Sequence, residues 1–409
     1  MSSLTLLNDN LYFSADIAQL GEEVWRLSTE SLAVASMGDL SPAGDADPAG
    51  LTVAGGVLYF VLDDGVHGRE LWRSDGTATG TALVADINTG PADSWPHSLV
   101  AVADTVYFAA SDPVAGTELW RTDPQLGAVR VRDIRPGNAD SSPARLTAHA
   151  NMLYFTADDG THGEELWRSD GTAAGTVLVA DIDPGTADGL PASLFSAGDA
   201  LYFSADDGHS GRELYRTDDA GTTQLADLNP GAPGSYPAAM TLHQGSLYFV
   251  ARDTIAGREL WRFDNTGVTR ITDLQPGPAD SSPQKLVSHD GLLYFTADDG
   301  IHGEELWRTD GSAAGTELVA DLAPGGDDAF PGRVAALGNQ LMFSADDGAS
   351  GRELWSLNAD GTTQLLDLSP GAEGSFPHQL RSLADGLYFN ATTPLTGSEL
   401  YRLQDSQTE

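Results

Sequence analysis

Apolar and polar residues follow a pattern that recurs every 46 to 48 residues along the whole chain. Each repeat holds an apolar-Tyr-Phe-type triplet and then the phrase Gly-x-Glu-Leu/Val-Trp/Tyr. In the repeat 51–98, short β-branched and aromatic runs separated by turn residues predict strands at 51–54, 57–62, 69–74 and 82–87. The pair Asp75-Gly76 opens the last hairpin, as Asp-Gly pairs commonly do. Four antiparallel strands in each repeat predict a propeller blade and an all-β fold.

The number of repeats predicts the number of blades. Eight repeats carry all four strands and the ninth carries three, which gives 35 strands. Residues 146–193 match residues 286–333 at 31 of 48 positions, three repeats later, so a triplet of blades has been copied. We therefore predict one propeller domain over 1–409 that closes as a ring of nine blades with pseudo-threefold symmetry; the alternative is eight blades. The predicted units are 4–50, 51–98, 99–145, 146–193, 194–239, 240–285, 286–333, 334–379 and the partial unit 380–409.

The phrase Glu-Leu-Trp-Arg-Ser-Asp-Gly-Thr, at 70–77 and again at 165–172, resembles the ELW-x-x-DGT repeat of large bacterial proteins. The resemblance covers nearly the whole chain, although the Asp-Gly-Thr half is degraded in most repeats. It implies a β-propeller in a secreted or surface-attached protein. The family has no common activity, so the resemblance implies nothing about catalysis.

Charge excludes several classes of partner. The 60 Asp and Glu residues outnumber the 21 Lys and Arg residues, which gives a formal net charge of −39. Nucleic acids and anionic membrane surfaces need clustered basic residues, so neither is an expected partner. The chain has no cysteine, which rules out disulfides and thiolate metal sites. The first residues do not resemble a signal peptide, but the dense negative charge favours a secreted or cell-surface protein.

One glutamate recurs in all nine repeats. These glutamates are Glu23, Glu70, Glu118, Glu165, Glu213, Glu259, Glu305, Glu353 and Glu399. A residue needed once for chemistry would not be needed nine times, so we interpret them as a structural polar ladder. The aromatic residue two positions later is predicted to wedge between blades, and the Phe of the second strand to lie in the core.

Acidic turns suggest a cation. Five turns between the second and third strands contain Asp-Asp-Gly, and strand direction places them on the same face as the acidic segments between repeats. Ca²⁺ accepts six to eight oxygen ligands and is the one candidate ion; no cofactor is expected to be required. The alternative is diffuse condensation of cations on an acidic face. The candidate ligands are Asp63, Asp64, Asp158, Asp159, Asp206, Asp207, Asp298, Asp299, Asp346 and Asp347.

Histidines and common catalytic motifs give no site. His67, His162 and His302 occupy one column of the repeat, so they lie on separate blades and are expected to form local turn contacts. The sequence contains no nucleophile elbow, P-loop or dinucleotide fingerprint.

The residue before the proline that leads into each blade varies. It is aromatic at Trp95, Tyr236, Phe330 and Phe376, which we expect near the channel mouth. Variable residues on a regular frame often determine specificity, so these four are candidate ligand contacts; the alternative is that they fill gaps between blades.

These observations favour a non-enzymatic, extracellular or surface-associated propeller that acts as a rigid interaction or structural module. The expected chain is a monomer whose ligand is a protein or a glycan. Two alternatives stay open, namely a multivalent lectin-like propeller and a glycan hydrolase or lyase with its site at the channel mouth.

Overall fold

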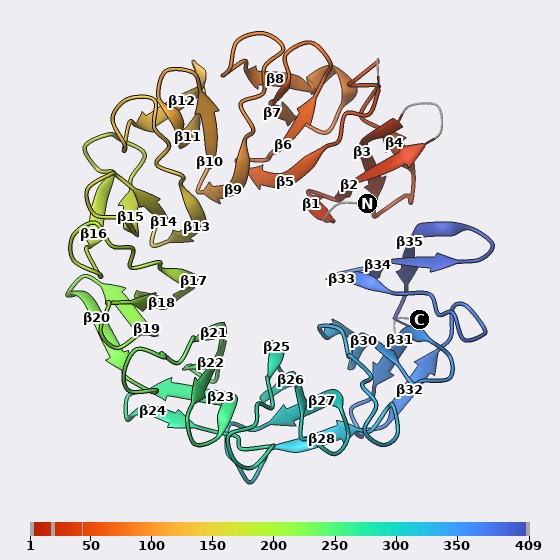
Figure 1. Ribbon diagram of the computed structural model, residues 1–409. Helices are drawn as coiled ribbons and strands as arrows, with labels where there is room; N and C mark the ends of the chain where they lie inside the picture. The colour runs from red at the N-terminus through yellow and green to blue at the C-terminus, as the bar shows by residue number, and fades with distance from the viewer. Residues whose placement is uncertain (1–3, 18–20, 43, 406–409) are drawn as a thin grey trace. The chain divides into compact units, whose positions relative to one another are not determined.

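The computed structural model describes residues 4–17, 21–42 and 44–405. These residues contain 35 strands and a single 3-10 turn, η1 (Ala78–Gly80). The strands form nine antiparallel sheets, eight with four strands and one with three, and each sheet uses consecutive strands of the chain (Figure 1). The fold is therefore all-β, a nine-bladed β-propeller. The predicted class and strand count are confirmed, and the eight-bladed alternative is wrong.

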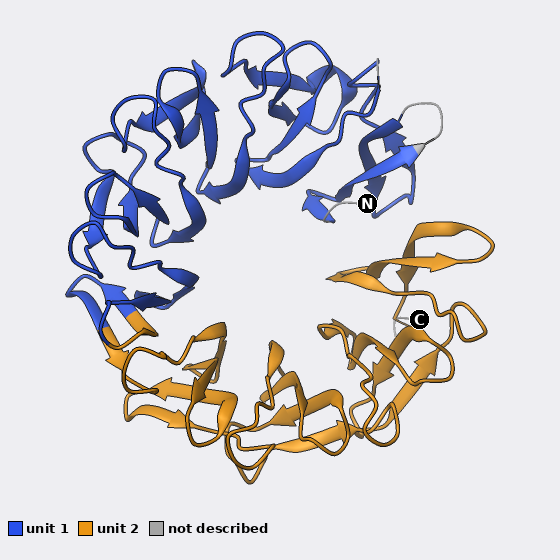
Figure 2. Cartoon of the chain, viewed as in Figure 1, with its two compact units in different colours: residues 1–209, 216–223 blue, residues 210–215, 224–409 orange. Residues whose placement is uncertain are grey.

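The chain divides into two compact units (Figure 2). Unit 1 comprises residues 1–209 and 216–223, and unit 2 comprises residues 210–215 and 224–409, so the division falls within the fifth sheet. A single domain over 1–409 and closure of the blades into a ring stay predictions.

Unit 1 contains the first four sheets and part of the fifth. The strands of these five sheets are β1 (Thr5–Leu7), β2 (Asn10–Ile17), β3 (Gly21–Ser28), β4 (Val34–Ser36); β5 (Ala49–Ala54), β6 (Val57–Asp63), β7 (Arg69–Ser74), β8 (Ala82–Ala85); β9 (His97–Val102), β10 (Thr105–Asp112), β11 (Gly116–Asp123), β12 (Gly127–Arg132); β13 (Ala144–His149), β14 (Met152–Asp158), β15 (Glu164–Ser169), β16 (Val177–Ala180); and β17 (Ala192–Ala197), β18 (Ala200–Asp206), β19 (Arg212–Asp218), β20 (Gly221–Ala226).

Unit 2 contains the rest of the fifth sheet and the last four sheets. The strands of these four are β21 (Ala238–His243), β22 (Ser246–Asp253), β23 (Gly257–Asp264), β24 (Gly267–Arg270); β25 (Gln284–His289), β26 (Leu292–Asp298), β27 (Glu304–Thr309), β28 (Glu317–Ala320); β29 (Ala335–Leu337), β30 (Gln340–Asp346), β31 (Arg352–Leu357), β32 (Thr363–Leu366); and β33 (His378–Leu383), β34 (Gly386–Thr393), β35 (Gly397–Leu403).

The second sheet shows how sequence determines strand ends. All four predicted strands are present, but β5 begins two residues early at Ala49, β6 ends one residue late at Asp63, and β8 ends two residues early at Ala85. The strand ends because the backbone N–H groups of Ile87 and Asn88 bond to the Glu70 carboxylate and are not available to the ladder. The carboxylate thus ends the last strand and begins the segment that crosses to the next sheet, which we call the crossing segment.

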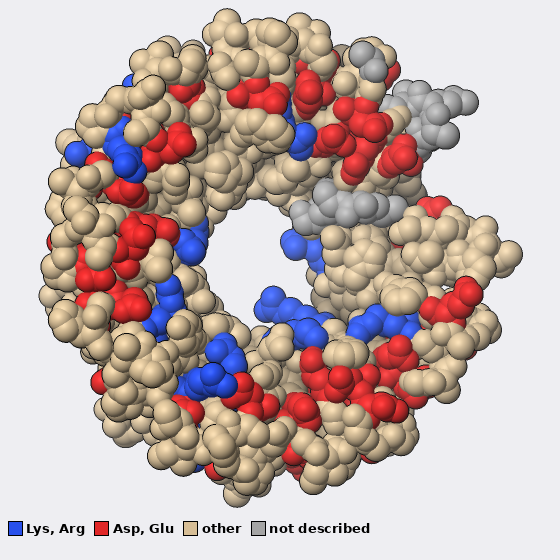
Figure 3. Space-filling view, viewed as in Figure 1, with Lys and Arg blue, Asp and Glu red and all other residues tan. Residues whose placement is uncertain are grey.

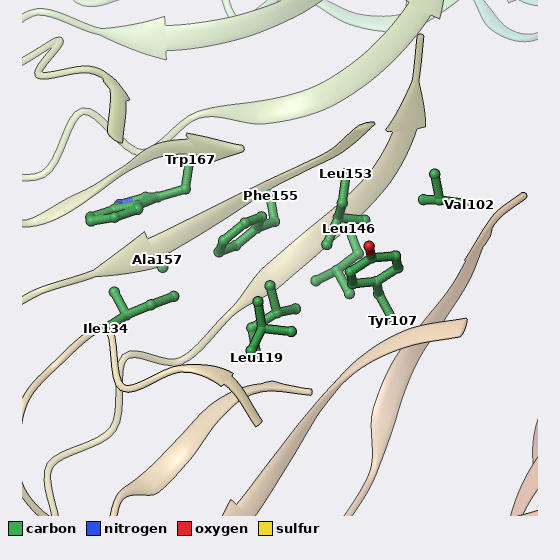
Figure 4. Packing of buried hydrophobic residues seen from close by; sticks show 10 residues of the cluster. Val102, Tyr107, Leu119, Ile134, Leu146, Leu153, Phe155, Ala157 and Trp167 are labelled. Carbon is green, nitrogen blue, oxygen red and sulfur yellow. The ribbon is translucent and has the colours of Figure 1, made fainter. Parts of the chain in front are cut away.

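The core lies between neighbouring sheets. In one cluster, Phe155 and Trp167 of the fourth sheet pack with Leu119 and Ile134 of the third (Figure 4). Phe155 is fully buried and Trp167 is 3% exposed. The structure thus places this Trp between two sheets and the second-strand Phe in the core, as the repeat pattern predicts.

Candidate functional site

The recurrent glutamates hold the crossing segments against the sheets. Glu70 accepts hydrogen bonds from the N–H of Ile87 and Asn88, each at 3.2 Å, and from the Ser94 hydroxyl at 2.6 Å. The neighbouring arginine is not the partner, since in the first sheet Arg26 donates to the carbonyl of Gly76 in the next sheet, at 3.0 Å. This geometry supports a structural role. The fully buried members of the column are Glu23, Glu70, Glu118, Glu165, Glu213, Glu259, Glu305 and Glu353.

Burial raises the pKa of most of these glutamates, because a charged carboxylate loses its hydration. The pKa of Glu23, Glu165 and Glu305 rises to about 7. The crossing segments behind these three carry Ala46, Gly189 and Ala329 at the position where the five others carry a serine. A hydroxyl such as that of Ser94 donates to the charged form and opposes the rise in pKa.

The Asp-Asp-Gly turns use their carboxylates internally. Asp63 Oδ1 accepts from the N–H of Gly65 at 2.8 Å, and Asp64 Oδ1 accepts from the N–H of Val66 and His67. The His67 ring contacts Asp64 Oδ2 through Nδ1 at 2.7 Å, and this carboxylate raises the pKa of the imidazole. His162 and His302 make the same local contact.

The remaining Asp-Asp-Gly turns repeat the backbone contacts of the first. The first aspartate of each pair accepts from the glycine N–H, and the second accepts from the residue after the glycine. These pairs are Asp158 and Asp159, Asp206 and Asp207, Asp298 and Asp299, and Asp346 and Asp347. No group of three or more His, Cys, Asp or Glu side chains that could hold a metal ion occurs within the described residues. Calcium binding stays a prediction.

The residue before each crossing proline has a left-handed backbone. The φ angles are 50° at Trp95, 51° at Tyr236, 45° at Phe330 and 50° at Phe376, a region that bulky residues rarely adopt. The four side chains are 49% to 60% exposed, so they project from the surface and do not fill gaps between sheets. Trp95 lies in unit 1 beside Arg69, whose guanidinium is 5.8 Å from the ring centroid.

A cavity of about 380 Å³ lies between the eighth and ninth sheets of unit 2. It is lined by Gly332, Arg333, Val334, Ser344, Pro377, His378, Gln379 and Leu380. Phe330 and Phe376 directly precede its two lining segments in the chain, whereas Tyr236 belongs to the crossing segment before the sixth sheet. Two of the four candidate aromatic residues are therefore close in sequence to lining residues of this cavity, although neither lines it, and a ligand contact at all four stays a prediction.

The eighth sheet departs from the repeat at this cavity. Its first strand, β29, has three residues, whereas β25 and β33 have six. Gly332 lies where a Cβ atom would be 2.6 Å from the Ser344 hydroxyl, so only glycine allows this approach. The Gly332 N–H bonds to the Ser344 carbonyl at 2.6 Å and holds the shortened edge in place.

In the eighth sheet, two positive charges occupy columns that carry one charge of each sign in the fourth and seventh sheets. The second residue after the crossing proline pairs with the residue before the recurrent glutamate: Arg145 with Glu164 at 2.5 Å, and Lys285 with Glu304 at 3.3 Å. In the eighth sheet the two columns hold Arg333 and Arg352. Arg333 is exposed and makes no hydrogen bond or ion pair with the described residues.

Arg352 fixes the surroundings of the cavity. Its Nη2 donates to the Phe330 carbonyl at 2.6 Å, its Nη1 donates to the Ser344 hydroxyl at 3.0 Å, and its carbonyl accepts from the Phe376 N–H at 3.0 Å. Burial lowers the pKa of Arg352, but a guanidinium stays protonated at physiological pH. His378 bonds to the Phe376 carbonyl through Nδ1 at 3.0 Å, so Nδ1 is the donor and Nε2 stays available.

The site has the opposite charge to the chain as a whole. On the face drawn in Figure 3, basic side chains of unit 2 gather near the first strands of its sheets, and acidic side chains lie farther out along the sheets. A cavity with an unpaired guanidinium, an imidazole nitrogen and apolar lining residues can bind an anion that carries an apolar group. Sequence reasoning missed Arg333, Arg352, Ser344 and His378. Comparison of the two charge columns across repeats could have found the arginines.

A second cavity, of about 580 Å³, lies in unit 1 between the second and third sheets. It is lined by Ile87, Asn88, Thr89, Asp112, Pro113, Val114, Trp120 and Arg130. Its one basic residue, Arg130, is paired with Asp112 at 2.8 Å. This cavity therefore offers no unpaired charge to a ligand.

Comparisons with known proteins show the fold. No protein-family profile matches the chain, and no curated protein matches it. The nine sheets themselves confirm the propeller repeat architecture. Since no family profile matches, membership of the ELW-x-x-DGT family stays a prediction. No helix among the described residues is long and apolar enough to cross a membrane.

Several solved structures are similar in fold. A puromycin-hydrolysing peptidase of Mycobacterium tuberculosis is 13% identical with a TM-score of 0.44, covering 84% of this chain and 58% of that one. The dihydro-heme d1 dehydrogenase NirN is 15% identical with a TM-score of 0.47, covering 90% and 74%. The β-propeller domain of the Trilobed protease from Pyrococcus furiosus is 12% identical with a TM-score of 0.38, covering 78% and 96%.

These structures correct the expected function. The matching propellers belong to peptidases and a dehydrogenase, which corrects the expectation of a non-enzymatic interaction module. They also lend no support to the lectin-like and glycan-active alternatives. A secreted or cell-surface location stays a prediction. The chain spans about three-fifths of the length of the puromycin-hydrolysing peptidase. At these identities the likeness shows the fold alone and assigns no reaction.

Proposed function

We propose that this chain is an enzyme-related propeller that binds a small substrate or product through the cavity between its eighth and ninth sheets. The ligand is a carboxylate that carries an aromatic or other apolar group. The observation that carries the proposal is that Arg333 and Arg352 occupy the two columns where the fourth and seventh sheets hold an ion pair.

Charge supports an anionic ligand. With a formal net charge of −39, an arginine without an acidic partner, such as Arg333, is an exception on this chain. Arg352 uses Nη1 and Nη2 to hold its neighbours, and Arg333 has its whole guanidinium available for a carboxylate. A protonated Nε2 of His378 would add a third donor.

The aromatic rings support an apolar group on the ligand. Phe330 is 49% exposed and Phe376 is 55% exposed, and Arg352 bonds to the backbone of both. Rings fixed in this way offer contact area with little loss of conformational entropy on binding.

The proposal is tested with N-acetylphenylalanine and its neutral amide as probes. Isothermal titration calorimetry of the whole chain should show saturable binding of the acid and binding at least tenfold weaker of the amide. Arg333→Gln should weaken binding of the acid by at least tenfold, because charged hydrogen bonds contribute about 1.5–3 kcal/mol.

Two variants control for a purely structural effect. Arg145→Gln removes the arginine at the same column of the fourth sheet and should leave binding unchanged. Arg352→Glu recreates the charge pair of the fourth and seventh sheets and should abolish binding while the melting curve stays cooperative. Equal binding of acid and amide, or equal loss in Arg145→Gln and Arg333→Gln, would contradict the proposal.

A further inference from the structure

The ninth sheet is incomplete within the described residues. It contains β33, β34 and β35, whereas each of the other eight sheets has a fourth strand on the outer side of its third strand. In the third sheet, for example, β12 pairs with β11 over five residue pairs, from Leu119 with Arg132 to Asp123 with Gly127. The outer edge of β35 therefore presents backbone N–H and carbonyl groups that no described strand pairs.

Glu399 lies on β35 and differs in burial from the other recurrent glutamates. The eight other glutamates of its column are 0% exposed, but Glu399 is exposed. Their partners come from the fourth strand and the crossing segment that follows it. Glu118 accepts from the N–H of Ile134 at 3.0 Å, from the N–H of Arg135 at 3.2 Å and from the Ser141 hydroxyl at 2.7 Å. For Glu399 no described segment supplies these donors.

The described chain leaves this edge after β35. Asp405 lies against Gly338, in the turn between β29 and β30 of the eighth sheet. Tyr401 and Leu403 of β35 pack against the apolar cluster that residues of the eighth and ninth sheets form together. One face of β35 is thus covered in the usual way, and its edge is open.

We propose that the outer edge of β35 binds an extended segment of a partner protein, which completes the ninth sheet as a fourth strand. The segment has the chemistry of the fourth strands of this chain: alternating apolar residues, then Asp-Ile or Asp-Leu, then a serine eight residues after the aspartate. The N–H groups that follow its aspartate and the serine hydroxyl bond to Glu399.

The eight four-stranded sheets show which kind of segment fits this edge. These sheets show one kind of segment in this position, and all eight of their column glutamates accept an N–H that follows the fourth strand, at 3.0 to 3.5 Å. A second copy of the chain is a weaker candidate, because its own segments of this sequence are already built into its sheets. The mode is β-strand addition, in which main-chain hydrogen bonds supply affinity and side-chain contacts supply specificity.

A peptide from the third sheet is the probe. The third, sixth and ninth sheets occupy equivalent places in the three-sheet period, as the matching ion pairs Arg130 with Asp112 and Arg270 with Asp253 show for the first two. A labelled peptide of residues 127–143 should bind the whole chain saturably in fluorescence anisotropy. Hydrogen exchange should slow at the amides of β35 when the peptide binds.

Glu399→Gln is the decisive variant, because an exposed side chain can be replaced without unfolding the sheet. It should weaken peptide binding at least tenfold, and a peptide of the same composition in scrambled order should not bind. No saturable binding, equal binding of the scrambled peptide, or exchange that slows away from β35 would overturn the proposal. Self-association through β35 in sedimentation, with the peptide as competitor, would overturn it in favour of a second copy.

Discussion

Ala329→Ser tests the physical role of the recurrent glutamates. Ala329 is fully buried in the crossing segment behind Glu305. Glu305 accepts from the Ala323 N–H at 3.0 Å through Oε1, and its Oε2 is buried without a partner. In the next sheet the equivalent Ser375 donates to Glu353 at 2.5 Å. The substitution should therefore supply Glu305 with the hydroxyl it lacks.

The raised pKa of Glu305 determines how the stability of the chain changes with pH. Burial raises the pKa of Glu305 to about 7 in the folded chain, from an ordinary value of 4.5. The folded state thus binds the proton more tightly, so the contribution of this group to stability is fully present below about pH 4.5 and is lost as pH rises through about 7. A donor that lowers the folded pKa should reduce this loss.

The stabilisation expected from Ala329→Ser is that of one hydrogen bond to a charged carboxylate. Such a bond contributes about 1.5–3 kcal/mol, and one pKa unit corresponds to about 1.4 kcal/mol, so the pKa of Glu305 should fall by about one to two units. Ala329→Ser should raise the free energy of unfolding by about 1.5–3 kcal/mol at pH 8 and by much less at pH 5, where Glu305 is already protonated.

The assay is denaturant unfolding at pH 5 and pH 8, with the pH dependence of the melting temperature from calorimetry. Ser375→Ala is the matched reverse change and should destabilise the chain more at pH 8 than at pH 5. An equal effect of Ala329→Ser at both pH values, or destabilisation at pH 8, would refute the reasoning.

Three further predictions follow from the packing and the turns. Trp167→Ala should lower the free energy of unfolding by about 3–5 kcal/mol in denaturant unfolding, since it empties the space between the third and fourth sheets; an unchanged stability would contradict that packing. Gly171→Ala should cost about 1–3 kcal/mol in the same assay, because its φ is +90° and a Cβ would lie 2.5 Å from the hydroxyl of the Tyr107 ring, whereas Gly137→Ala, with open space, should cost less. At fixed ionic strength Ca²⁺ at millimolar or lower concentration should raise the melting temperature saturably and Mg²⁺ should not substitute for it, because Ca²⁺ accepts carboxylate and turn-carbonyl oxygens such as those of the Asp63 and Asp64 turn; equal, non-saturating responses to both ions would leave only diffuse condensation of cations on the acidic face.

Sequence periodicity was sufficient for the fold. The spacing of Glu70 and its equivalents, with the Asp-Gly turns, predicted nine sheets and 35 strands, because each blade is built from local hairpins. The early end of β8 could not be predicted, since it depends on Glu70 reaching Ile87 across the sheet. That contact exists only in three dimensions.

The candidate site was only partly predictable. Phe330 and Phe376 stood out because they vary at a regular position. Arg333 and Arg352 are 19 residues apart, and the sequence does not show that Arg352 bonds to Ser344, which lines the same cavity as Arg333. The cavity itself depends on the close approach of Gly332 to Ser344, which follows from packing and not from a motif.

The structure of the chain crystallised with N-acetylphenylalanine tests the central claim most directly. The account predicts density for the carboxylate beside Arg333, in the cavity between β29 to β32 and β33 to β35, with the phenyl ring against Phe330 or Phe376. An empty cavity at a saturating ligand concentration, or density only at another site, would contradict it.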